Sequence, residues 1–127
     1  MNQTGKIGMS ESLFFDTYAF FEIIRGNPDY RPYLDAKIIT TIFNLAELNY
    51  NLKRENNKKA DNYTQKYSKF TVEVTIDDIK SAMDLKIQYK HLSIPDAIGY
   101  TVAKRLGISF LTGDNDFKGM KHVEFVK

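Results

Sequence analysis

The sequence contains no cysteine. This absence excludes disulfide bonds, thiolate metal sites and cysteine nucleophiles together. No apolar run comes near the roughly 20 residues that a membrane span needs. Residues 1–12 carry a lysine with no apolar stretch behind it, unlike a signal peptide. These absences predict a soluble, cytoplasmic protein with no membrane partner.

The charge balance is also small. The chain has 18 Lys and Arg against 16 Asp and Glu, a formal net charge of +2. This balance is compatible with a nucleic-acid partner but does not imply one, so binding to a polyanion would depend on local charge. One basic cluster is evident in the sequence, and such a run is more often a solvated helix face: Lys53, Arg54, Lys58 and Lys59.

The length and composition fit one folded domain. The chain has 127 residues, of which 43% are hydrophobic and 13% aromatic, enough for a sizeable core. We see no internal repeat, low-complexity tract or linker that would divide it. We therefore predict a flexible N-terminal tail over residues 1–12 and a single domain over residues 13–127.

Short apolar segments alternate with amphipathic segments along this domain. The pattern predicts strands at 13–15, 37–41, 71–74, 108–112 and 123–126. It predicts helices at 18–25, which Gly26 ends, at 43–56 and at 58–70, one that follows a capping box at 75–78, and one from 94 that ends at Gly107. Short, wholly apolar strands between helices are typical of parallel sheets covered on both faces. We predict an α/β fold with three α/β/α layers and a central, mostly parallel sheet of four to five short strands.

Four carboxylates fall where such a sheet binds ligands. Asp16 directly follows the first predicted strand, and Asp114 lies two residues after the strand that ends at Thr112. Asp96 lies in the first turn of a helix, and Glu47 lies in the first turns of the helix after the second strand. Open parallel sheets bind ligands beyond the carboxyl ends of their strands, so we expect these four side chains to share one edge.

Each of these acids also has a purely structural interpretation. Asp16 is a good helix N-cap, Asp96 a good capping-box partner for Ser93, and Glu47 an ordinary helix surface residue. Turn formation equally explains the last two acids, Asp114 and Asp116. Convergent carboxylates, however, repel one another unless a cation neutralises them. Oxygen ligands select Mg²⁺ or Mn²⁺, and such ions activate water for attack on a phosphodiester.

Four short motifs carry these acids, and their order along the chain is more specific than any one of them. They read F-F-D-T at 14–17, N-L-A-E-L at 44–48, P-D-A-I-G-Y at 95–100 and L-T-G-D-N-D-F at 111–117. The set resembles the PIN domain and, more narrowly, the small single-domain PIN ribonucleases of the VapC toxin type. The resemblance covers the chain from about Leu13 to Lys127.

The resemblance implies a metal-dependent endoribonuclease that acts on RNA. Its catalytic acids would be Asp16, Glu47, Asp96 and Asp114. Its ligands for one or two Mg²⁺ or Mn²⁺ ions would be Asp16, Asp96, Asp114 and Asp116, with the assignment between the last two left open. Supporting hydroxyl groups would come from Thr17 and Thr112. The resemblance further implies a homodimer and, for a toxin, an antitoxin protein as partner.

Two departures and two alternatives accompany this interpretation. Gly99-Tyr100 replaces the small aliphatic pair that usually follows P-D-A-I, and the tail is longer than such a toxin needs. The main alternative is a catalytically silent PIN-like module that binds RNA or protein, because a fold does not establish an activity. A haloacid-dehalogenase-like phosphatase is disfavoured, since it needs a second Asp where this chain has Tyr18. Neither His91 nor His122 belongs to a motif, and we predict no catalytic role for them.

Overall fold

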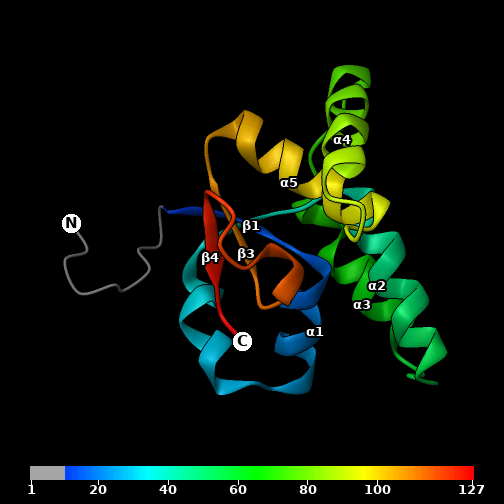
Figure 1. The fold of residues 1–127 in the computed structure, drawn as a ribbon. Helices are drawn as coiled ribbons and strands as arrows, with labels where there is room; N and C mark the ends of the chain where they lie inside the picture. Colours follow the sequence, from blue (N-terminus) through cyan, green and yellow to red (C-terminus); the bar gives the residue numbers. More distant parts are fainter. Residues whose placement is uncertain (1–10) are drawn as a thin grey trace.

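The computed structural model describes residues 11–127, and its middle layer is one sheet of four parallel strands (Figure 1). The strand order is β2-β1-β3-β4. The strands are β1 (Ser12–Phe15), β2 (Lys37–Ile39), β3 (Ser109–Thr112) and β4 (Val123–Phe125). The predicted α/β fold with a parallel sheet is confirmed. Of the predicted N-terminal tail, residues 1–10 lie outside the described part of the chain, and Ser12 already belongs to β1.

Helices connect the strands and cover the sheet. The α-helices are α1 (Thr17–Arg25), α2 (Ile42–Arg54), α3 (Ala60–Tyr67), α4 (Ile76–Gln88) and α5 (Ile94–Leu106). Short 3-10 helices are η1 (Pro28–Asp35), η2 (Ser68–Phe70) and η3 (Asn115–Phe117). As predicted, α1 and α5 each end at a glycine with left-handed backbone, Gly26 (φ 80) and Gly107 (φ 69). No helix within residues 11–127 is long and apolar enough to cross a bilayer.

The alternation of side chains along β1 divides the interior into two cores. Leu13 and Phe15 face a core built mainly with α1, α2 and α3, whereas Phe14 faces a core built with α4 and α5. Successive side chains of a strand point to opposite faces, so the apolar run of β1 serves both cores. This arrangement makes the three layers of the fold and leaves the ends of the strands free for a site.

One predicted strand is wrong. Residues 71–74 form no strand, and their sheet-like pairing is limited to an isolated bridge between Thr71 and Thr40. Val72 and Val74 instead pack against the core beneath α4 and α5. Their alternation with polar neighbours therefore reflects one-sided burial of an extended segment. The predicted helix at 58–70 is also shorter, since it consists of α3 followed by η2.

The unusual Gly99 has a steric explanation. A Cβ atom at this position would lie 2.9 Å from Phe14 Cε1 and 3.0 Å from Asn44 Oδ1. The first contact is shorter than real Cβ contacts show and the second is tighter than most of them, so the glycine lets α5 approach β1 and α2 closely. Asn44 is fully buried there and accepts a hydrogen bond of 2.7 Å from the Thr41 hydroxyl. This close approach fixes the two helices that carry Glu47 and Asp96.

Candidate functional site

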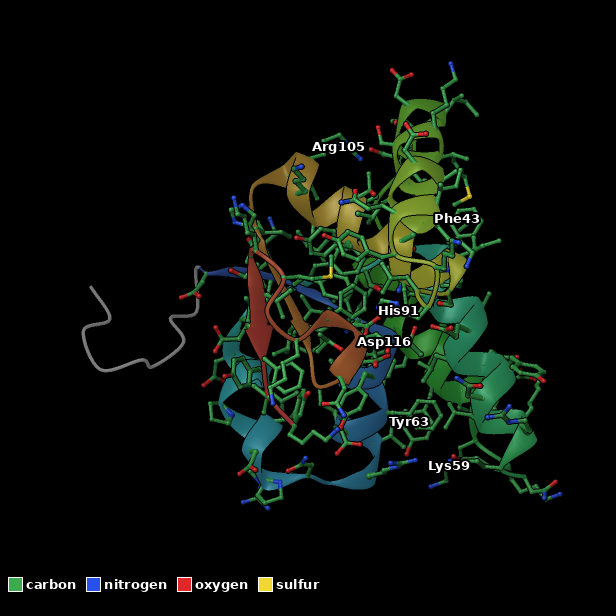
Figure 2. The ribbon with its side chains drawn as sticks, in the orientation of Figure 1. Phe43, Lys59, Tyr63, His91, Arg105 and Asp116 are labelled. Carbon is green, nitrogen blue, oxygen red and sulfur yellow. The ribbon has the colours of Figure 1, made fainter. Side chains whose placement is uncertain are left out.

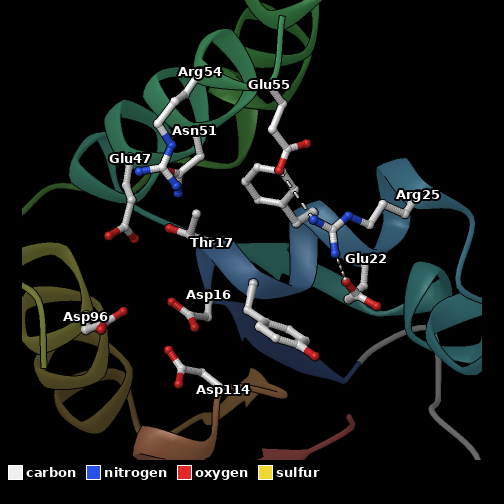
Figure 3. Close-up of a pocket in the computed structure, with 12 residues that line it drawn as sticks. Asp16, Thr17, Glu22, Arg25, Glu47, Asn51, Arg54, Glu55, Asp96 and Asp114 are labelled. Atoms are coloured by element: carbon white, nitrogen blue, oxygen red, sulfur yellow. Dashed lines mark hydrogen bonds and ion pairs between the residues drawn. The ribbon is translucent and has the colours of Figure 1, made fainter. Parts of the chain in front are cut away.

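The site lies at the point where the strand order reverses. β1 pairs with β2 on one side and with β3 on the other, so the chain leaves β1 and β3 in opposite directions. Such a point opens a crevice at the carboxyl ends of the strands. A pocket of ≈ 310 Å³ occupies it, and the four predicted acids line the pocket (Figure 3): Asp16, Glu47, Asp96 and Asp114.

Asp16 lies at the base of this pocket with an exposed fraction of only 1%. Its Oδ2 accepts a hydrogen bond of 2.7 Å from the Thr112 hydroxyl, whereas its Oδ1 has no partner. Among the described residues, this oxygen is the only buried side-chain polar atom left without a hydrogen bond. Asp16 stands at the N-cap position of α1, but its side chain makes no capping bond. The carboxylate therefore serves the pocket, and capping does not explain it.

Asp96 caps α5 and lines the pocket at the same time. Its Oδ2 accepts a hydrogen bond of 3.0 Å from the Ser93 amide, and its own amide donates to the Ser93 hydroxyl at 3.1 Å, which completes the predicted capping box. The Ser93 hydroxyl also donates to Glu47 Oε2 at 3.1 Å. One serine thus connects the helix cap to an acid on α2, and the cap fixes the orientation of the Asp96 carboxylate.

The turn after β3 holds the remaining acids. The Asp114 amide donates to the Thr112 hydroxyl at 3.1 Å, and Asp114 Oδ1 accepts from the Asp116 amide at 3.0 Å. Thr112 therefore links both Asp16 and Asp114. Asp116 is exposed and does not line the pocket. Nevertheless, one carboxylate oxygen from each of Asp96, Asp114 and Asp116 lies within 4.8 Å of the others.

The two predicted supporting hydroxyl groups have different surroundings. Thr112 donates directly to the Asp16 carboxylate, as described above. The Thr17 hydroxyl instead donates to the Asn44 carbonyl at 3.2 Å, which joins the start of α1 to α2.

Burial and mutual repulsion raise the pKa values of the two innermost acids. The pKa of Asp16 is raised well above its ordinary value, chiefly by burial and then by the charge of Asp96. The pKa of Asp96 is raised to about 6, chiefly by burial, with Glu47 and Asp114 adding to the rise. Protons or a cation must therefore compensate the negative charge here at neutral pH.

The residues present fit a hard divalent cation. The pocket offers only oxygen ligands, one of them buried without a partner, and three carboxylate oxygens converge within 4.8 Å. Oxygen donors of this kind suit Mg²⁺ and Mn²⁺. The same repulsion that raises the pKa values of Asp16 and Asp96 would favour binding of such an ion.

The outer part of the pocket contains residues that the sequence did not single out as site residues. They come from α1, from α2 and from the C-cap of α2: Tyr18, Phe21, Glu22, Arg25, Asn51, Arg54 and Glu55. Arg25 donates to Glu22 at 3.3 Å and to Glu55 at 3.4 Å, which connects the two helices across the outer end (Figure 3). The spacing from Glu47 to Asn51 and Arg54 is helical and marks one face of α2. That spacing was available in the sequence, whereas the partner face on α1 was not.

Gly113 determines how the chain passes from Thr112 to Asp114. A Cβ atom there would lie 2.1 Å from the Val126 carbonyl oxygen and 2.5 Å from Tyr18 Cε1. We expect Gly113→Ala to lower the free energy of unfolding by about 2 kcal/mol, because the overlap forces backbone to move. Chemical denaturation would measure the loss. A matched control is Gly119→Ala, where the new methyl group meets no atom within 4 Å and the cost comes from the left-handed backbone alone. Equal losses in both variants would contradict this explanation.

Fold and site together define a class: a small α/β domain with an acidic pocket at the switch point of a parallel sheet. The sequence model of the PIN domain matches residues 13–123. The chain therefore belongs to the PIN domain family. No curated protein matches the chain in sequence.

Two solved structures share the fold. A toxin–antitoxin complex from Klebsiella pneumoniae matches with a TM-score of 0.70 and 21% identity over 87% of this chain and 94% of that chain. VapC20 of Mycobacterium tuberculosis, a toxin that cleaves the sarcin–ricin loop, matches with a TM-score of 0.75 and 21% identity over 91% of this chain and 99% of that chain. At this identity the likeness establishes the fold they share.

Proposed function

We propose that this chain is a Mg²⁺- or Mn²⁺-dependent endoribonuclease that hydrolyses phosphodiester bonds in RNA. The observation that carries the proposal is the buried, unpartnered Oδ1 of Asp16 in a pocket that Glu47, Asp96 and Asp114 also line. Within residues 11–127, Asp16 makes no capping bond and no ion pair, and such an acid is well suited to bind a metal ion. Membership of the PIN domain family supports the same chemistry.

The position of each residue in the pocket determines the role that we propose for it. A divalent ion, when bound, supplies charge that polarises a phosphoryl oxygen and lowers the pKa of a water molecule. Asp16, Asp96 and Asp114 would hold this ion, with Asp116 as a further oxygen donor at the exposed side. Glu47 is fixed by Ser93 through Oε2, and its other oxygen would orient the attacking water and accept its proton.

We further propose that the chain is the toxin of a toxin–antitoxin pair. The proposal takes its support from the two structures that share the fold, one a toxin–antitoxin complex and the other a toxin that cleaves the sarcin–ricin loop. Its partner would be an antitoxin protein, and its location the cytoplasm, where RNA is accessible. Growth that continues normally when the chain alone is induced in cells would contradict this part.

A homodimer is part of the same proposal. Several large apolar side chains are exposed on and near α4, the most exposed being Ile76 at 72% and Ile87 at 74%. A second copy could bury such side chains. Light scattering would then give twice the chain mass of 14.7 kDa, and a monomer at micromolar concentration would contradict the proposal.

The main test is metal-dependent cleavage of a labelled single-stranded RNA. We expect cleavage with Mg²⁺ or Mn²⁺, none in EDTA, and a roughly 100-fold lower kcat for Asp96→Asn, because the pocket loses one of its charges. Asparagine still accepts the Ser93 amide, so the cap of α5 is kept.

Asp78→Asn is the matched control, since Asp78 forms the equivalent capping box with Thr75 on α4, outside the pocket. We expect this change to lower stability, because Asp78 also pairs with Arg105 at 2.8 Å, and to leave kcat nearly unchanged. Cleavage that persists in EDTA or in Asp96→Asn would disprove the mechanism. Absence of both cleavage and divalent-ion binding by calorimetry would instead favour the catalytically silent module.

A further inference from the structure

A second groove lies away from the acidic pocket, between α4, α5 and the segment from Lys118 to His122. It has a volume of ≈ 670 Å³, and we call it the basic groove. Its lysines are Lys104, Lys118 and Lys121, and its aromatic side chains are Tyr89, Tyr100 and His122. Within residues 11–127, no carboxylate lines it. The groove therefore has a chemistry opposite to that of the pocket.

The positive charge of this groove is not compensated by ion pairs. In the described part of the chain, Lys104, Lys118 and Lys121 are exposed and form no salt bridge. The ammonium group of Lys118 lies over the Phe125 ring, 5.8 Å from its centroid. In the basic cluster noted in the sequence, by contrast, Lys53 pairs with Asp61 at 2.9 Å. The three groove lysines are thus all available to bind an anion.

The backbone that presents these groups is firmly held. The buried Tyr100 donates a hydrogen bond from its hydroxyl to the Lys121 carbonyl, and its ring stacks on Phe117 with centroids 5.9 Å apart. The Phe110 amide donates to the His122 carbonyl at 2.8 Å, which joins the segment to β3. His122 has a left-handed backbone with φ 61, a conformation that a residue other than glycine keeps only when its surroundings hold it. The groove is therefore preformed.

The basic groove begins where the acidic cluster ends. Lys118 follows Asp116 by two residues, and Asp116 shares the cluster with Asp96 and Asp114. His91 Nε2 lies 3.4 Å from the Asp116 carbonyl oxygen (Figure 2), and the His91 ring lies 6.4 Å from the Tyr89 ring that lines the groove. A chain that leaves the pocket past Asp116 would therefore reach Tyr89 and Lys118 next.

We propose that the basic groove binds the phosphate backbone of single-stranded RNA on one side of the bond to be cleaved. This inference rests on the proposed ribonuclease function. An acidic pocket repels a polyanion, and a net charge of +2 offers little general attraction, so affinity must come from local positive charge. Lysines bind phosphates without reading sequence, and Tyr89 offers a ring on which a base can stack.

The test measures binding of a fluorescein-labelled single-stranded RNA by anisotropy in EDTA over a series of KCl concentrations. Each phosphate contact on a single strand contributes about 0.7 to the slope of log K against log salt. We expect the triple variant Lys104→Ala, Lys118→Ala, Lys121→Ala to lose about 2 from this slope. The matched control removes the same charge from exposed lysines outside the groove, Lys37→Ala, Lys58→Ala and Lys80→Ala, and we expect it to keep the slope. Circular dichroism would verify that both triples are folded.

Equal slopes for the two triples, or no RNA binding by the unmodified chain at low salt, would overturn the inference. A groove triple that keeps RNA binding but loses binding to polyglutamate would overturn it in favour of an acidic protein partner. The proposed function fails separately, because binding in EDTA requires no turnover. A chain that binds RNA through the groove without cleaving it would refute only the ribonuclease, and a chain that cleaves with an unchanged slope would refute only the groove.

Discussion

Asp16→Asn is expected to lower kcat for RNA cleavage by roughly a thousandfold. The substitution keeps the shape of the side chain and an oxygen that can accept the Thr112 hydroxyl. It removes the charge of the one buried carboxylate oxygen that has no partner in the protein. If that charge holds the divalent ion, its loss costs about 4 kcal/mol of transition-state stabilisation, which corresponds to the expected factor.

The same substitution is expected to stabilise the protein when no metal is present. Burial and the neighbouring Asp96 raise the pKa of Asp16, so its charged form destabilises the folded state at neutral pH. Thermal melting in EDTA at pH 7.5 would therefore give a higher Tm for Asp16→Asn than for the unmodified chain. Asp84→Asn, on the exposed surface of α4, is the control that should change neither Tm nor kcat. A variant that is both active and less stable would contradict the role given to Asp16.

Local signals in the sequence were sufficient to predict most of the fold. The capping boxes at Thr75 and Ser93, and the glycine stops at Gly26 and Gly107, depend on hydrogen bonds and backbone angles within a few residues. The apolar strands predicted a parallel sheet because both of its faces are buried. The segment at 71–74 misled this reasoning, since an extended chain packed on one side has the same alternation as a strand.

The site was only partly accessible to such reasoning. The sheet topology predicts that Asp16 and Asp114 lie near each other, because they follow neighbouring strands. Nothing local predicts that Ser93 reaches Glu47, or that Asp96 caps a helix with one oxygen while the residue lines the pocket. The structural and functional interpretations of Asp96 are therefore compatible, because the same residue caps α5 and lines the pocket.

The positive charge of the basic groove could likewise not be predicted from local signals in the sequence. Its lysines come from α5 and from the segment before β4, and they are separated in sequence by acids and apolar residues. The cluster that is contiguous in sequence, around Lys53, is in contrast partly neutralised by Asp61. Whether a charge is compensated depends on which side chains the fold brings together. Counting charged residues along the sequence therefore does not reveal it.

The metal-free protein is expected to lose stability as the pH rises from 5 to 7.5. Asp96 has a folded-state pKa of about 6 against an ordinary value of 3.8, so the folded state binds more protons than the unfolded state between these values. Unfolding then becomes easier as pH increases through this window. The full rise in the pKa of Asp96 corresponds to about 3 kcal/mol, and the part lost between pH 5 and 7.5 is on the order of 1.4 kcal/mol, or about 5 °C in Tm. The raised pKa of Asp16 has the same sign.

Adding Mn²⁺ or Mg²⁺ should reverse this loss at pH 7.5 and have little effect at pH 5. At the higher pH the carboxylates are charged and available as ligands, and an ion at a hundred times its Kd stabilises the fold by about 2.7 kcal/mol. At the lower pH, protons compete for the same oxygens. Melting curves at both pH values, with EDTA and with metal, measure all four conditions. In the Asp16→Asn variant, both the fall in Tm with rising pH and the recovery of Tm on adding metal should be smaller than in the unmodified chain. A Tm in EDTA that rises with pH would show that these carboxylates do not repel one another. An equal recovery of Tm in the variant and the unmodified chain would show that they do not bind the ion.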